Sequence, residues 1–154
     1  MLQRKQSLFL IGAIVMMVLV TISSPFFVSE GKTLSAYTWF GGFVGDKAQE
    51  LNQVDGLIGV SGYLNVVVAA IFVFCLSQFK NRKLQIKLNL ISLLVLLVST
   101  SLFLLDFMKV STVYTAELNS LIFVFISVTI VMVVLANNGI RRDEELIKSV
   151  DRIR

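Results

Sequence analysis

The sequence contains no histidine, a single cysteine and a single proline among its 154 residues. Without histidine the chain lacks the commonest general base and the commonest protein ligand for metals, which excludes Ser-His and Cys-His catalysis. The cysteine, Cys75, lies inside an apolar run. A disulfide within one chain is therefore excluded, and we expect Cys75 to be a small buried hydrophobe.

Charged residues are also scarce. They make up 16% of the chain, against 56% hydrophobic residues, and the mean hydropathy is +0.83. Soluble domains contain about 25% charged residues. A water-soluble chain of this length exposes much of its surface, and this one has too few polar residues to cover it. We therefore expect the lipid bilayer to be the solvent for most of the protein.

Four apolar stretches are long enough to cross a hydrocarbon core, which takes about 20 helical residues. They cover approximately residues 7–28, 57–79, 88–108 and 118–136. A membrane barrel would alternate polar and apolar residues, whereas these runs are continuously apolar, and a helix in lipid satisfies its own backbone. The sequence predicts an all-α membrane protein, a single four-transmembrane-helix bundle.

Basic residues are segregated by the four predicted spans. Eleven of the 14 lie in the first few residues, the link 80–87 and the tail: Arg4, Lys5, Lys80, Arg82, Lys83, Lys87, Arg141, Arg142, Lys148, Arg152 and Arg154. Basic loops stay on the cytoplasmic side, so we expect both termini and this link to be cytoplasmic. The same segregation accounts for the net charge of +4, and we do not expect nucleic-acid binding.

The outer side should carry two connections. Residues 29–56, about 28 residues, form the one loop long enough to fold, and its centre at 37–43 is rich in aromatic residues and glycine. A short hairpin and a strip lying at the membrane interface both fit this centre. Residues 46–55 predict a turn or two of amphipathic helix. The outer link 109–117 is short, so we expect the spans that it joins to be antiparallel neighbours.

The tail, residues 140–154, has the pattern of a cytoplasmic amphipathic helix. Its apolar residues recur at helical spacing: Ile140, Leu146, Ile147, Val150 and Ile153. Acids precede bases along it, which complements the helix dipole. Asn138-Gly139 is a helix-stop signal that would separate the tail from the fourth span. Because Ile140 keeps register with Ile147, we favour a continuous helix.

Three polar side chains inside the spans are candidates for function. Asn65 and Asn89 lie at different depths, so we expect each to bond to a neighbouring helix and not to the other. Asp106 is the one acid within a span, and Lys109 follows it near the outer end. We expect the Asp106 carboxylate to reach the interface beside that lysine. A proton or cation relay is the alternative.

Small residues recur in the second span at Gly56, Gly59 and Gly62. We expect them to let this helix approach another backbone closely. No metal-ligand spacing and no nucleophile with a nearby base occurs in the sequence, so we expect no metal, no cofactor and no catalytic residues.

The two ends carry motifs of their own. Gln3-Arg4 with Gln6 precedes the first span, and Asp143-Glu144 is followed by Leu146, Ser149 and Asp151-Arg152. With these motifs the chain resembles a family of small four-helix inner-membrane proteins of Bacteroidota, described as a domain of unknown function. The resemblance implies a bacterial inner (cytoplasmic) membrane location and the same architecture. It implies no activity.

The ordered ends suggest contacts with other proteins. We expect the N-terminal segment and the tail to pack together or to dock a cytoplasmic partner, through residues from both ends: Gln3, Arg4, Arg141, Arg142, Asp143, Glu144, Asp151 and Arg152. The leading hypothesis is a non-enzymatic scaffold or accessory subunit of a membrane complex, with protein partners or further copies of itself. A small transporter, channel or ion-coupled protein is the second hypothesis. A membrane enzyme, using Asp106, Tyr114 and Glu117, is the third.

Overall fold

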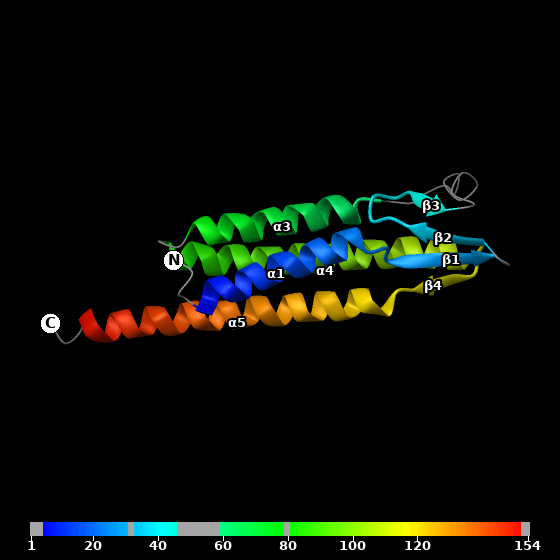
Figure 1. Cartoon of the computed structure of the whole chain (residues 1–154). Coiled ribbons are helices and arrows are strands. Elements are labelled where there is room, and N and C mark those ends of the chain that lie inside the picture. The colour runs from blue at the N-terminus through cyan, green and yellow to red at the C-terminus, as the bar shows by residue number, and fades with distance from the viewer. Residues whose placement is uncertain (1–4, 31–32, 46–58, 79–80, 152–154) are drawn as a thin grey trace.

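The computed structural model describes residues 5–30, 33–45, 59–78 and 81–151, with the backbone alone for residues 5, 6, 30 and 144–151. Four long helices lie side by side in this part of the chain, and a small β-sheet sits at one end of them (Figure 1). The helices are α1 (Lys5–Ile22), α3 (Ser61–Ser77), α4 (Arg82–Ser111) and α5 (Ser120–Asp151). The start of α1, the α3–α4 connection and the end of α5 all lie at the end opposite the sheet.

Buried residues recur along α1, α4 and α5 at alternating intervals of three and four. On α1 they are Leu10, Ala13, Met17 and Val20, and on α5 they are Ile122, Ile126, Thr129, Val133, Ala136 and Ile140. This period places one stripe of each helix against its neighbours, as in coiled coils and four-helix bundles. α1 packs most extensively on α5, and α3 on α4. α4 and α5 are antiparallel, as predicted, but pack together more lightly.

The sheet has the strand order β3-β2-β1-β4, and every neighbouring pair is antiparallel. Its strands are β1 (Phe26–Glu30), β2 (Thr33–Tyr37), β3 (Phe43–Gly45) and β4 (Ala116–Leu118). β4 comes from the α4–α5 connection and pairs with β1, which joins the two halves of the chain. One sheet face is buried against the C-terminal end of α4, where the Phe26 and Phe107 rings lie 5.4 Å apart.

The prediction of an all-α protein is therefore wrong at this end of the molecule. α1 ends at Ile22 and does not continue to Val28, because Pro25 cannot donate a helical hydrogen bond and Phe26–Val28 form a strand. In this strand Phe26 and Val28 are buried while Phe27 is less so. Of the two conformations considered for residues 37–43, the hairpin is correct. The amphipathic helix expected at 46–55 lies outside the described residues.

The residues predicted as the fourth span and those predicted as the tail form one helix. α5 runs through Asn138-Gly139 without a break, which confirms the continuous alternative. A glycine inside a helix costs about 1 kcal/mol relative to alanine. Complete burial of Ile140, the next residue, offsets that cost. α4 likewise begins at Arg82, earlier than the predicted 88, and incorporates most of the basic link.

Candidate functional site

The buried stripe of α4 is unusually polar. Five of its residues, which we call the polar seam, are Gln85, Asn89, Ser92, Ser99 and Asp106. Apolar Leu96 and Phe103 interrupt the seam, and both are fully buried. Polar groups buried between helices in this way need hydrogen-bond partners there, because they are removed from bulk solvent.

Asp106 joins three elements at the sheet end of the bundle. Its side chain is 0% exposed. The carboxylate Oδ2 accepts hydrogen bonds from the hydroxyl of Tyr37 on β2, at 2.9 Å, and from the backbone N–H of Gly59, just before α3, at 3.1 Å. The expectation that this carboxylate reaches the surface is wrong, because the sheet covers it. Sequence reasoning missed the role of Tyr37, because the hairpin considered for residues 37–43 gave no indication of which helix it would contact.

Tyr37 is the hydrogen-bond donor in its contact with Asp106. Burial raises the pKa of its phenol above the ordinary value of 10, and the negative charge of Asp106 and the hydrogen bond raise it further. The phenol therefore keeps its proton at physiological pH, and the Asp106 carboxylate has a permanent neutral donor. The Tyr37 ring also stacks on Phe26, with centroids 4.4 Å apart, which fixes its direction.

The Trp39 side chain caps the C-terminal end of α1. Its indole N–H donates to the carbonyl oxygens of Val20 and Ser23, at 2.6 and 2.8 Å. The last carbonyls of a helix have no partner within the helix, so the indole satisfies a group that would otherwise be unpaired. The ring is 1% exposed and lies edge-on to Phe103 of α4. The aromatic content of residues 37–43 was the only sequence signal for this role.

Gly59 and Gly62, two of the three glycines considered in the sequence, lie very close to the backbone of another segment. A Cβ on Gly62 would lie 2.7 Å from the Trp39 carbonyl oxygen, and one on Gly59 would lie 2.7 Å from the Cα of Gly41. Close approach is therefore confirmed for these two positions, but the neighbouring backbone belongs to the β2–β3 turn and not to another span. Gly56 lies outside the described residues.

Replacement of Gly62 by alanine should destabilise the protein. The new methyl group collides with backbone, which cannot move freely, and overpacking of this kind costs about 1–3 kcal/mol. Gly12 in α1 is the matched control, because a Cβ there meets only the flexible Met132 side chain at 3.5 Å. Gly12→Ala should instead stabilise the helix by up to about 1 kcal/mol. Thermal unfolding in detergent measures both, and the same direction of shift for the two variants would contradict the structure.

Asn65 and Asn89 each bond to a neighbouring helix, as predicted. The Ser99 hydroxyl of α4 lies 2.7 Å from Oδ1 of Asn65 on α3 and 2.9 Å from the Ser61 carbonyl oxygen. Asn89 donates through Nδ2 to Oδ1 of Asn137 on α5, at 2.7 Å. The role of Asn137 was missed, because the Asn-Asn-Gly segment was interpreted only as a helix stop.

Gln85 is the seam residue nearest the start of α4. It donates through Nε2 to the carbonyl oxygen of Cys75 on α3, at 3.1 Å. Cys75 itself is buried in the core, as predicted. These contacts join α4 to α3 at Gln85 and Ser99, and to α5 at Asn89.

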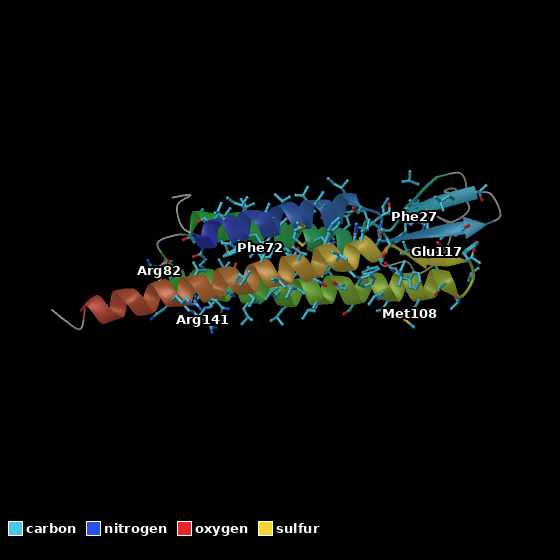
Figure 2. The ribbon with its side chains drawn as sticks, turned by 60° about the horizontal axis from the view of Figure 1, so that its bottom comes forward. Phe27, Phe72, Arg82, Met108, Glu117 and Arg141 are labelled. Carbon is cyan, nitrogen blue, oxygen red and sulfur yellow. The ribbon has the colours of Figure 1, made fainter. Side chains whose placement is uncertain are left out.

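Among the contact residues predicted at the chain ends, the structure describes the side chains of Arg141, Arg142 and Asp143. Arg141 and Arg142 are exposed and Asp143 is half-buried. Arg82 at the start of α4 lies at the same end of the bundle as Arg141 (Figure 2). Gln3, Arg4 and Arg152 lie outside the described residues, and Glu144 and Asp151 are described only as backbone of α5. The start of α1 and the end of α5 do share one end of the molecule.

The three residues proposed for an enzyme are not brought together. Glu117 on β4 is exposed and pairs with Phe27 on β1 (Figure 2). Side chains alternate along a strand, so Phe27 points away from the buried face to which Phe26 belongs. Asp106 contacts Tyr37 on that buried face, so the sheet separates the two carboxylates. Within the described ranges, no three Cys, Asp or Glu side chains gather as metal ligands would.

Two helices are long and apolar enough to cross a membrane, namely α4 and residues Ser120–Asp143 of α5. α1 and α3 are shorter apolar helices.

A family model for a domain of unknown function, DUF4293, matches residues 2–153. The chain belongs to the DUF4293 family. The resemblance to a domain of unknown function is thereby confirmed over nearly the whole chain. Searches of curated proteins and of solved structures give no match to this DUF4293 protein.

Proposed function

We propose that this DUF4293 protein is an integral inner-membrane protein with four spans and cytoplasmic termini, and that it is a non-enzymatic scaffold or accessory subunit of a membrane complex. The observation that carries the proposal is the inverted polarity of α4. Its buried stripe holds the polar seam, while its exposed surface is apolar: Leu84, Leu90, Ile91, Leu94, Leu97, Val98, Leu105 and Met108.

Inverted polarity separates a membrane helix from the core helix of a soluble protein. A soluble core helix is mostly buried, whereas 28% of the most apolar stretch of α4, and 28% of that of α5, is buried within the protein. An apolar surface of this extent is stable only against lipid or another protein. The 18 residues of α1 and 17 of α3 correspond to about 27 and 26 Å of helix, close to the ~30 Å hydrocarbon core.

The placement of charge supports cytoplasmic termini. Arg82 at the start of α4 lies at the same end of the bundle as Arg141 of α5. Lys83 and Lys87 follow Arg82 in the first two turns of α4, and Arg142 follows Arg141 within α5. Lys109 lies at the sheet end. Basic residues stay on the cytoplasmic side during insertion, so this asymmetry favours a cytoplasmic helix end and an external sheet.

The hydrogen bonds that Asp106 accepts favour a scaffold over a protein that uses Asp106 as a relay acid. A relay acid needs a path to both sides of the membrane, whereas this carboxylate accepts hydrogen bonds from Tyr37 and Gly59 that hold the sheet on the helices. α5 also continues for about 11 residues, or roughly 16 Å, beyond the buried Ile140. A helix that extends beyond the packed core offers a surface for a cytoplasmic partner.

An ion-coupled transporter remains the second candidate, and the polar seam is the observation that favours it. Its weakness is that Leu96 and Phe103 interrupt the seam. Proton or cation flux into proteoliposomes, abolished in Asp106→Asn, would support a transporter. Unchanged background flux in both proteins would support the scaffold.

Reporter fusions test the topology. A reporter at Arg154, or inserted between residues 81 and 86, should be cytoplasmic, and one inserted at Thr112, between α4 and β4, should be external. Pairing an alkaline phosphatase with a fluorescent protein at each position distinguishes the two sides. An external signal at either of the first two positions, or extraction of the protein by alkaline carbonate without detergent, would overturn the membrane proposal.

Truncation after Ile140 tests the scaffold role. The bundle residues remain, so the truncated protein should keep the detergent stability of the full chain and lose a co-purifying partner. The matched control is Arg141→Gln with Arg142→Gln in the full chain, which removes the two exposed charges while keeping the helix. A truncated protein that retains every crosslinked partner of the full chain would contradict a docking role for the tail.

A further inference from the structure

Two polar atoms between the helices have no hydrogen-bond partner in the described part of the chain. They are Nδ2 of Asn65 and Oδ1 of Asn89. The two side chains are 1% and 0% exposed. An unpaired amide donor or acceptor in a protein interior costs about 1–3 kcal/mol, so such groups are nearly always satisfied by protein or by ordered water.

We propose that Asn65 and Asn89 each bind an internal water molecule, one at the α3–α4 interface and one at the α4–α5 interface. Water meets the hydrogen-bonding requirement of both atoms. Asn65 needs an acceptor and Asn89 needs a donor, and water provides both. A buried water requires two to four polar partners.

Each site offers those partners. Near Asn65 are the Ser99 hydroxyl and the Ser61 carbonyl oxygen, which already bond to each other. Near Asn89 are the Asn137 carboxamide and the hydroxyl of Ser92, which donates to the Asn89 carbonyl oxygen and keeps free lone pairs. The second water would strengthen the α4–α5 interface, which is less extensive than the α3–α4 interface.

The two waters are isolated from each other. Asn89 and Ser99 are ten residues apart on α4, or about 15 Å along the axis. Leu96 on α4 and Val68 and Phe72 on α3 occupy the level between them, and all three are fully buried. The sites are therefore structural, and they do not form a continuous file of water through the bundle.

Water-edited solid-state NMR on the full chain in lipid bilayers tests the proposal. It measures how fast magnetisation passes from water to each labelled N–H group. With ¹⁵N-labelled asparagine and tryptophan, the Asn65 and Asn89 carboxamides should gain signal several-fold faster than the Trp39 indole. Trp39, the only tryptophan, is the matched control, because it is equally buried but bonded to protein carbonyls. Loss of one peak in Asn65→Thr and another in Asn89→Thr assigns the signals.

Transfer to either carboxamide no faster than to Trp39 would overturn the proposal. In a second sample with ¹³C-labelled leucine and valine methyl groups, rapid transfer to Leu96 or Val68 would also overturn it, since that result indicates a continuous water path and supports the transporter. The inference depends on helix packing and not on the scaffold role, so loss of the scaffold hypothesis would leave the NMR result unchanged.

Discussion

Replacing Trp39 with alanine should lower the free energy of unfolding by about 3–5 kcal/mol, the range for removing a large buried aromatic side chain. The ring fills the space between α1, the β2–β3 turn and Phe103 of α4, and its N–H satisfies two carbonyl oxygens near the end of α1. The variant loses packing and leaves these carbonyls unpaired. Thermal unfolding followed by size-exclusion chromatography in mild detergent measures the effect.

Two further variants separate the contributions of Trp39. Trp39→Phe keeps most of the ring but removes the donor, and should cost about 1–3 kcal/mol, as expected for an unpaired buried group. Phe40→Ala is the matched control, because this neighbouring aromatic is 47% exposed, and it should have a much smaller effect. Equal destabilisation by Trp39→Ala and Phe40→Ala would contradict the structure.

Replacing Asp106 with leucine should also be among the most damaging changes, at about 2–6 kcal/mol, because two buried donors lose their acceptor. Leucine has a similar volume but accepts no hydrogen bond, so the Tyr37 hydroxyl and the Gly59 N–H lose their common acceptor inside the protein. Each buried group left without its partner costs about 1–3 kcal/mol. The unfolding midpoint should fall, and protease sites in the sheet should become accessible before the helices unfold.

The coupling between Asp106 and Tyr37 can be measured directly. In a double-mutant cycle with Asp106→Leu and Tyr37→Phe, the two effects should be non-additive, because each variant removes the same bond. Ser101→Ala on the exposed side of α4 is the control, since its hydroxyl bonds only to the Leu97 carbonyl of its own helix. It should change stability by less than about 0.5 kcal/mol. Additive effects in the cycle would show that the contact does not form.

The helical part of the fold could be predicted because its signal is local. Each helix is a run of apolar residues, and the expectation that lipid surrounds such a run was sufficient to predict a helix. The roles of Asn65 and Asn89 were also predictable, since a polar amide within an apolar helix must bond to a neighbour. The identity of the neighbours was not, because Ser99 and Asn137 come from other helices and pair through the rotation of each helix in the bundle.

The sheet could not be predicted from the same patterns. β4 has three residues and becomes a strand only by pairing with Phe26–Val28, which the sequence places next to an apolar span. The burial of Asp106 follows from this pairing, since the sheet that covers it includes Tyr37. The sequence shows only that Asp106 lies about one turn before Lys109 near the end of a helix. This pattern does not indicate that a sheet covers the carboxylate.

The sequence by itself determined four apolar helices and the clustering of basic residues at one end, because composition and spacing along the chain specify both. It favoured a continuous last helix but left the Asn138-Gly139 stop signal as an alternative, and the structure decided between them. Only the tertiary structure decided that residues from the α1–α3 and α4–α5 connections form one sheet, that Asp106 and Trp39 fasten this sheet to the helices, and that the polar face of α4 turns inward. The physical reason is that hydrogen bonds between distant segments depend on which surfaces meet. A linear pattern records which residues need partners, and the packed fold selects those partners.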